Sequence, residues 1–154
     1  MNHKIDSIDS KILNLLQQNA QLTNKEIATK ISLSITPVHD RIKKMEKEGI
    51  IDRYVTILNK KKVGQPLLVF CNVTLSKQTQ ENFQAFNTAV SILPEVLECN
   101  VVAGTFDYLL KIIVADMDSY HEFYQKKLSI LPMVSLIHSY FVMAEVKSTT
   151  MIPV

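Results

Sequence analysis

The sequence has few of the residues that stabilise small secreted domains or flexible, repetitive chains. Its 154 residues include two cysteines, three glycines, five prolines and no tryptophan. Cys71 and Cys99 show no CxxC spacing and no histidine at ligand spacing, so we expect buried, reduced thiols with neither disulfide nor metal. No apolar run approaches the roughly 20 residues of a membrane span, and the first ten residues lack a signal core. We therefore expect a soluble cytoplasmic protein.

The charged residues are unevenly distributed along the chain. Residues 1–64 hold 12 Lys and Arg against 7 Asp and Glu, whereas residues 65–154 hold 5 against 8. Hydrophobic residues make up 47%, enough for a sizeable core. A basic front and an acidic back are typical of a module that binds a polyanion, followed by one that does not touch it.

Residues 22–49 have the pattern of two short helices joined by a tight turn. Thr23 and Glu26 form a capping box at the start of the first helix, and Ser32 interrupts it. Ser34 or Thr36 caps the second helix, and its apolar stripe is Val38, Ile42 and Met45. Pro37 falls in the first turn of that helix and Gly49 provides a left-handed stop.

The second of these helices has one apolar side and one side rich in cations. A helix-turn-helix places such a helix in the major groove of DNA. The alternative is a solvated charged face, which many amphipathic helices have. The candidate DNA contacts are Ser34, Thr36, His39, Arg41, Lys43, Lys44 and Lys47.

Further elements complete a first domain over residues 1–58. Asp6 caps a helix from Ser7 to about Asn19, with Asp9 favourable in its first turn, which packs behind the other two helices. Ile50–Leu58 is rich in strand-forming residues and is expected to form a strand or wing. Residues 59–66 are polar, basic and broken by Gly and Pro, which indicates a hinge.

Residues 67–154 contain an internal repeat. The segment SILPEV at 91–96 returns as SILPMV at 129–134. Each copy follows an expected helix, 80–92 or 117–130, and precedes a strand. Strands are also expected at Leu67–Leu75 and Tyr108–Val114, which gives the β-α-β-β-α-β order of a ferredoxin-like domain and an α+β chain overall.

Helices cover only one face of such a sheet. Leu67, Val69 and Cys71 belong to the helix-covered face, whereas Leu68 and Phe70 belong to the open one. The open face needs a partner, most simply a second copy of the chain. A hairpin at residues 104–107 joins the central strands, and Gly104 is expected to adopt a backbone angle that other residues resist.

With both halves considered, the chain resembles the Lrp/AsnC family of bacterial and archaeal transcription regulators, and its leucine-responsive branch most of all. In the first domain the resemblance depends on IDSKIL at 8–13, LSITPV at 33–38 and EGII at 48–51. In the second it depends on LLVF at 67–70, FNTAV at 86–90, EC at 98–99, GTFDYLLK at 104–111, ADM at 115–117 and VMAEVK at 142–147.

The resemblance implies a winged helix-turn-helix that binds double-stranded DNA, and a sensing domain that forms homodimers assembling into octamers or higher forms. It implies no cofactor but a small amino-acid effector, such as leucine, methionine or another apolar amino acid, held between dimers. A nucleoid-associated location follows. The effector residues it implies are Gly104, Thr105, Phe106, Asp107, Tyr108, Met117 and Tyr140.

The residues themselves leave several roles open. Asp107 can accept an effector ammonium or brace the turn, and Tyr108 and Tyr140 suit packing better than ligand contact. The family often has an arginine-rich recognition helix, whereas here only Arg41 offers bidentate donation to guanine. His121 and His138 are expected to be structural.

Two other classes of function remain as alternatives. A sirohaem-decarboxylase-like enzyme shares the two-domain layout, but its tetrapyrrole substrate calls for basic groups in the second domain, which is net acidic here. The other is an interaction module that does not bind DNA.

Overall fold

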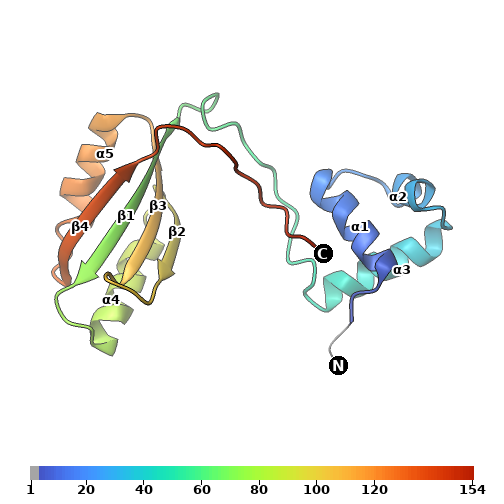
Figure 1. The fold of residues 1–154 in the computed structure, drawn as a ribbon, viewed down its shortest axis with the longest axis horizontal. Helices are drawn as coiled ribbons and strands as arrows, with labels where there is room; N and C mark the ends of the chain where they lie inside the picture. The colour runs from blue at the N-terminus through green and yellow to red at the C-terminus, as the bar shows by residue number, and fades with distance from the viewer. Residues whose placement is uncertain (1–3) are drawn as a thin grey trace. The chain divides into compact units, whose positions relative to one another are not determined.

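A bundle of helices forms the first unit of the chain in the computed structural model, which describes residues 4–154. The bundle consists of α1 (Ser7–Gln18), α2 (Asn24–Ile31) and α3 (Ile35–Lys47), in the order predicted (Figure 1). One hydrophobic core holds these helices together. Its most buried side chains are Ile12, Leu13, Ile27, Ala28, Val38, Ile42 and Met45.

Local signals in the sequence set the ends of these helices. Thr23 Oγ1 accepts from the N–H of Glu26 at 3.2 Å, and Glu26 Oε2 accepts from the N–H of Thr23 at 2.7 Å, which confirms the capping box. Ser34 is the N-cap of α3, although its side chain makes no capping hydrogen bond. Gly49 has φ of +72°, as predicted for a left-handed stop after α3.

The strand predicted for residues 50–58 does not form. Ile50 and Ile51 donate their N–H groups to the carbonyl of Met45 at the end of α3. Beyond them the backbone is extended, and no strand is assigned to residues 50–58 in the part of the chain that the structure describes. A strand needs a neighbour for its N–H and C=O groups, and residues 4–154 provide none here.

A segment from the far end of the sequence also belongs to the first unit. This unit comprises the chain up to Ile57 together with Lys147–Val154, a segment that the sequence predicts to belong to the second domain. The side chain of Gln17 on α1 accepts from the N–H of Ile152 at 2.6 Å and donates to its carbonyl at 2.9 Å. The two bonds fix this extended segment against α1.

The second unit contains a four-stranded antiparallel sheet with the strand order β2-β3-β1-β4. Its elements follow the predicted β-α-β-β-α-β order and confirm the ferredoxin-like fold. They are β1 (Leu67–Leu75), α4 (Gln80–Ser91), β2 (Val96–Val101), β3 (Tyr108–Val114), α5 (Met117–Phe123) with a π-helical turn (Tyr124–Leu128), and β4 (Val134–Phe141).

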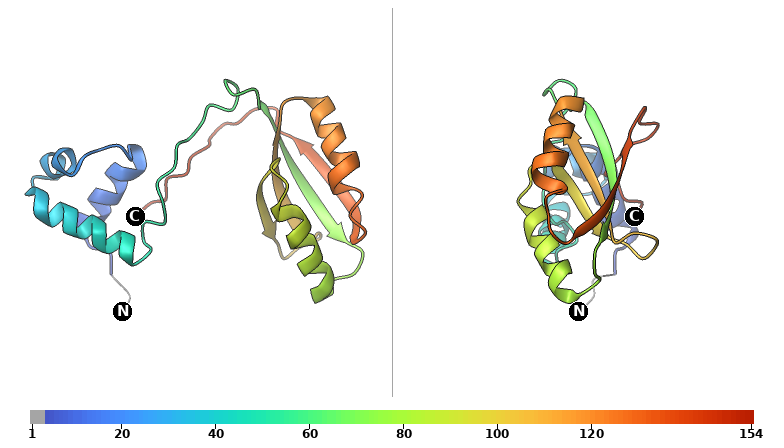
Figure 2. Two further views of the ribbon diagram at one scale, coloured as in Figure 1. Left: turned by 180° about the vertical axis from the view of Figure 1, so that it is seen from behind. Right: turned by 90° about the vertical axis from the view of Figure 1, so that its left-hand side faces the viewer.

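Helices α4 and α5 lie on the same face of the sheet (Figure 2). Alternate residues of β1 and β3 form the core beneath them, including Val69, Cys71, Tyr108, Leu110 and Ile112. No helix within residues 4–154 is long and apolar enough to cross a membrane.

Within the second unit, residues 58–146, no helix lies over the opposite face of the sheet (Figure 1). The strand register places Phe70, Ile113 and Tyr140 on this open face, and about half of Tyr140 is exposed. Leu68 lies on it too, but only 5% of Leu68 is exposed. The expectation of two buried thiols is half right, because Cys71 is buried and Cys99 is exposed.

Candidate functional site

The faces of α3 separate its core residues from its candidate DNA contacts. Val38, Ile42 and Met45 are buried, with at most 7% exposed. At about 100° per residue, the direction opposite this stripe is occupied by Thr36, Asp40, Lys43, Lys44 and Lys47. All five are exposed. Ser34 is exposed at the start of the helix, and His39 is exposed on the flank of this face.

The carboxylates of Glu46 and Asp40 reduce the positive charge of this face. Lys43 Nζ donates to Glu46 Oε2 at 2.8 Å, and the hydroxyl of Tyr54 donates to the other oxygen of Glu46 at 3.1 Å. The bond from Lys43 lowers the pKa of Glu46, and desolvation together with Glu46 raises the pKa of Tyr54 to about 12. His39 Nδ1 lies 3.1 Å from Asp40 Oδ1. The other exposed cations among the candidate contacts are Lys44 and Lys47.

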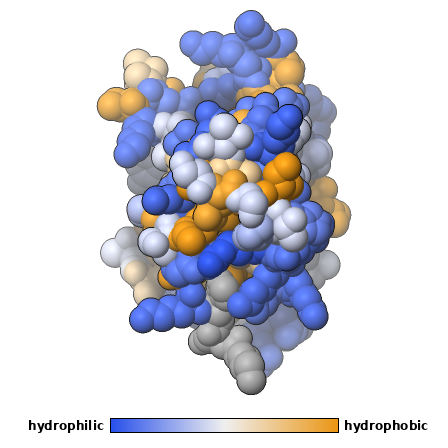
Figure 3. Space-filling model, turned by 90° about the vertical axis from the view of Figure 1, so that its right-hand side faces the viewer, coloured by the Kyte–Doolittle hydropathy of each residue, from blue (hydrophilic) through white to orange (hydrophobic). Residues whose placement is uncertain are grey.

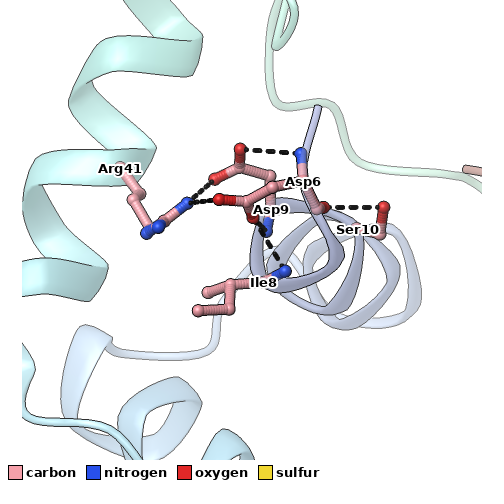
Figure 4. A network of polar contacts seen from close by, with 5 residues as sticks. All are labelled: Asp6, Ile8, Asp9, Ser10 and Arg41. Atoms are coloured by element: carbon pink, nitrogen blue, oxygen red, sulfur yellow. Dashed lines mark hydrogen bonds and ion pairs between the residues drawn. The ribbon is translucent and has the colours of Figure 1, made fainter. Parts of the chain in front are cut away.

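Arg41 is placed differently from the other candidate contacts. Its Nη1 donates to Asp6 Oδ2 and to Asp9 Oδ1, both at 2.7 Å (Figure 4). Asp9 is 1% exposed, and both carboxylates belong to the N-terminal turn of α1. Arg41 therefore joins α3 to α1, a contact that its spacing on a cationic helix did not reveal.

One face of the first unit has a hydrophobic patch at its centre and hydrophilic residues around it (Figure 3). Figure 3 views this unit from the side where α2 and α3 meet and shows hydrophilic residues around a small hydrophobic area. DNA phosphates are recognised by such polar and cationic surfaces.

The candidate effector residues begin in the loop between β2 and β3. Gly104 does not have a positive φ, since the glycines that do are Gly49 and Gly64, so the prediction of an unusual backbone angle was wrong. A Cβ added at Gly104 would meet no atom within 4 Å. Thr105 is exposed and Phe106 is partly buried. The loop is open to solvent, which is compatible with contact to a second molecule.

Asp107 acts as a brace inside the second unit. It is 7% exposed, and its Oδ2 accepts from the N–H of Leu75 at 2.7 Å. Its Oδ1 accepts from Gln78 Nε2 at 2.9 Å. Each carboxylate oxygen thus already has a partner at the end of β1, so the bracing alternative describes this arrangement. Neither Leu75 nor Gln78 was identified from the sequence, because the contact spans about 30 residues of chain.

Tyr108 is part of the core. Its ring is fully buried against Phe86, with centroids 4.3 Å apart. Its hydroxyl donates to Asn87 Oδ1 at 2.7 Å and faces the carbonyl of Phe83 at 3.3 Å. Burial raises the pKa of this phenol to about 12, so it stays a neutral donor. This placement agrees with a packing role.

Met117 and Tyr140 lie away from the loop and from each other. Met117 opens α5 on the helix-covered face, just after the end of β3, whereas residues 104–107 precede the start of β3. Seven residues of strand separate these ends by about 20 Å. Tyr140 pairs with Phe70 on the open face. One chain therefore does not bring the seven candidates into one cluster.

A hollow of about 320 Å³ lies beside Met117, between α5 and β4. At its base the hydroxyls of Tyr120 and Ser139 are 2.5 Å apart, and Cys71 Sγ is 3.2 Å from the Tyr120 hydroxyl. Desolvation raises the pKa of the Cys71 thiol. No local sequence pattern indicates this group, because its members come from three separate elements. The hollow is also lined by His121, Tyr124, Ile137 and Phe141.

Comparison with known proteins agrees with both halves of this description. Residues 5–52 match a family of winged helix-turn-helix DNA-binding domains, and residues 68–152 match the Lrp/AsnC ligand-binding domain. The leucine-responsive regulatory protein of Haemophilus influenzae is 43% identical over 96% of this chain and 89% of its own length. The protein of the same name from Escherichia coli K12 is 41% identical over 94% of this chain and 88% of its own.

Solved structures show the same two-part fold. A transcriptional regulator from Neisseria meningitidis, in complex with L-Met, superposes with a TM-score of 0.94 at 34% identity and covers 97% of each chain. An AsnC family regulator from Agrobacterium tumefaciens gives a TM-score of 0.92 at 36% identity, covering 96% of each. The relatives are named regulators rather than enzymes. This chain belongs to the Lrp/AsnC family of DNA-binding transcriptional regulators, with an amino-acid-binding domain joined to its helix-turn-helix.

Proposed function

We propose that this chain regulates transcription in response to an apolar amino acid, such as leucine or methionine, which alters its assembly and its binding to DNA. The observation that carries the proposal is the separation of the candidate effector residues over two ends and two faces of one sheet. Residues so placed can share a ligand only when copies of the chain supply different parts of the site. An effector at such a junction favours the assembly in which the junction is closed.

The relatives support the choice of effector. The regulator from Neisseria meningitidis was crystallised with L-Met, and the relatives from Haemophilus influenzae and Escherichia coli are named for their response to leucine. Met117, exposed at the start of α5, offers apolar surface to such a side chain. The proposed effector residues are Gly104, Thr105, Phe106, Met117 and Tyr140, with Asp107 and Tyr108 holding the loop from inside.

The exposed face of α3 supports the proposed DNA contacts. Thr36, Lys43, Lys44 and Lys47 point away from the core of the first unit, with His39 beside them and Ser34 at the helix start. A dimer formed through the open sheet face, on the side of Phe70 and Tyr140, would present two such helices to half-sites about one turn of DNA apart. We further propose that dimers assemble into octamers or higher forms that act on the nucleoid in the cytoplasm.

The test is a screen of the amino acids against the full-length chain. Thermal unfolding identifies the amino acids that bind, and light scattering follows the mass of the assembly in parallel. We expect leucine, methionine or a similar amino acid to raise the melting temperature and change the mass. Met117→Ala should weaken both responses, whereas Met143→Ala, a matched change at a fully exposed methionine, should leave them intact. Stabilisation without any change in mass or DNA affinity would contradict the proposed mechanism.

A further inference from the structure

The N-terminal turn of α1 and the recognition helix α3 share one hydrogen-bond network (Figure 4). Asp6 Oδ1 accepts from the N–H groups of Ile8 and Asp9, both at 2.8 Å, and Asp9 Oδ2 accepts from the N–H of Asp6 at 3.2 Å. These bonds form the capping box of α1. The second oxygen of each carboxylate accepts from Arg41. Arg41 thus completes a cap on another helix.

The burial of Asp9 makes this contact important. Asp9 is 1% exposed, and a buried carboxylate is stable only when hydrogen bonds and a cation compensate its charge. Arg41 supplies a cation at 2.7 Å, with about a third of its own side chain exposed. Arg41 therefore compensates the charge of buried Asp9, and this contact fixes the position of α3 against α1.

The geometry also limits what Arg41 can offer to DNA. Nη1 carries two hydrogens, and its two acceptors occupy both of them. Two of the five N–H groups of the guanidinium are therefore engaged with α1. Arg41 lies roughly 65° from the centre of the apolar stripe of α3, on the flank next to α1, whereas Lys47 lies almost opposite that stripe.

We propose that Arg41 is a positioning residue, not a base-reading one: it sets the orientation of α3 through Asp6 and Asp9, and the exposed face of α3 reads the DNA. This inference rests on the proposed function, because it concerns how the same helix binds DNA. It reverses the role that the sequence alone suggests for Arg41. A misoriented α3 loses all its base contacts together, whereas a lost base-reading side chain affects one base pair and its symmetry mate.

Selection of binding sites from a random duplex library tests this proposal with the full-length chain. The variants are Arg41→Ala, Asp9→Asn and the double variant. Asp9 is buried, so it cannot touch DNA, and any effect of Asp9→Asn on base preference must pass through the position of α3. Arg41→Lys serves as a conservative variant that keeps the charge, and circular dichroism checks that each variant is folded at the assay temperature.

We expect Arg41→Ala and Asp9→Asn each to weaken binding to the wild-type site at least tenfold and to flatten preference at every base pair under α3. The affinity of the double variant for the wild-type site should be at most about twofold below that of either single variant, because both substitutions remove the same interaction. Arg41→Lys should retain the same base preference with intermediate affinity. If Arg41→Ala does not fold, Asp9→Asn tests the proposal alone, since flattened preference is expected and wild-type binding would overturn it.

Two results would overturn the proposal in distinguishable ways. Loss of preference at one base pair and its symmetry mate in Arg41→Ala, with Asp9→Asn binding like wild type, would make Arg41 a base reader and leave the proposed function intact. A wild-type chain that enriches no sequence at all would instead overturn the proposed function, and this inference with it.

Discussion

Replacing Asp107 with alanine separates the bracing role of this carboxylate from a role in binding an effector. The substitution removes the acceptor for the N–H of Leu75, a buried group, and the acceptor for the side chain of exposed Gln78. Gln78 is solvated after the change, whereas the N–H of Leu75 loses its partner inside the protein. A buried donor without a partner costs about 1–3 kcal/mol.

We therefore expect Asp107→Ala to lower the free energy of unfolding of the second unit by about 2 kcal/mol. For a unit of this size each kcal/mol corresponds to about 4–8 °C, so the melting temperature of the ligand-free protein should fall by roughly 10 °C. Differential scanning calorimetry of the full-length chain without amino acids measures this fall. Asp107→Asn is the matched control, because its side-chain oxygen can still accept from the N–H of Leu75. Its melting temperature should fall by about half as much as that of Asp107→Ala.

A role of Asp107 in effector binding alone predicts a different melting behaviour. If Asp107 serves only to bind the ammonium group of an amino acid, Asp107→Ala leaves the melting temperature of the ligand-free protein unchanged and lowers it only in the presence of the effector. An unchanged melting temperature without ligand would refute the bracing role derived from the two hydrogen bonds.

Three further predictions concern other parts of the chain. The hydrogen bond from the N–H of Asp9 and, second, the one from Arg41 lower the pKa of Asp6 from its ordinary 3.8 to about 2. This carboxylate therefore stabilises the first unit above pH 4, and the stabilisation is lost as the pH falls through 2. Circular dichroism should therefore show the stabilities of wild type and Asp6→Asn converging as the pH falls toward 2, and a gap that persists there would contradict this linkage. Tyr108→Phe should cost about 1 kcal/mol in urea unfolding and leave amino-acid affinity unchanged, because the hydroxyl bonds only within the unit; weaker amino-acid binding by the folded variant would instead assign the hydroxyl to the effector. Tyr140→Lys should lower the mass of the assembly in light scattering by placing a charge on the open sheet face, and an unchanged mass would rule that face out as the dimer contact.

Much of the fold could be predicted from local sequence patterns. The capping box of Thr23 and Glu26, the left-handed Gly49 and the alternation of β1 depend on residues close in sequence, and the structure confirms them. The repeated SILP segment marked the two helix-to-strand turns and so predicted the ferredoxin-like order. These features follow from backbone geometry, which short sequence windows determine.

The contacts that the sequence did not reveal join distant segments. Arg41 and Asp9 are 32 residues apart, as are Asp107 and Leu75, and nothing in the local pattern pairs them. A cation on a helix looks the same in sequence whether it faces DNA or a buried carboxylate. The expected strand at residues 50–58 failed for a related reason, since strand-forming residues need a neighbouring strand that residues 4–154 do not supply.

The proposal that α3 binds duplex DNA through its exposed lysines is tested most directly by the salt dependence of DNA affinity. Each phosphate contact contributes about 0.9 to the slope of log K against log salt, so two helices with two lysines each contribute about 3 to 4. We predict that the double variant Lys44→Gln, Lys47→Gln lowers the slope by this amount, and that Lys77→Gln with Lys126→Gln, an equal charge change at exposed lysines of the second unit, leaves it unchanged. Equal slopes for the wild type and the Lys44, Lys47 variant would contradict the account.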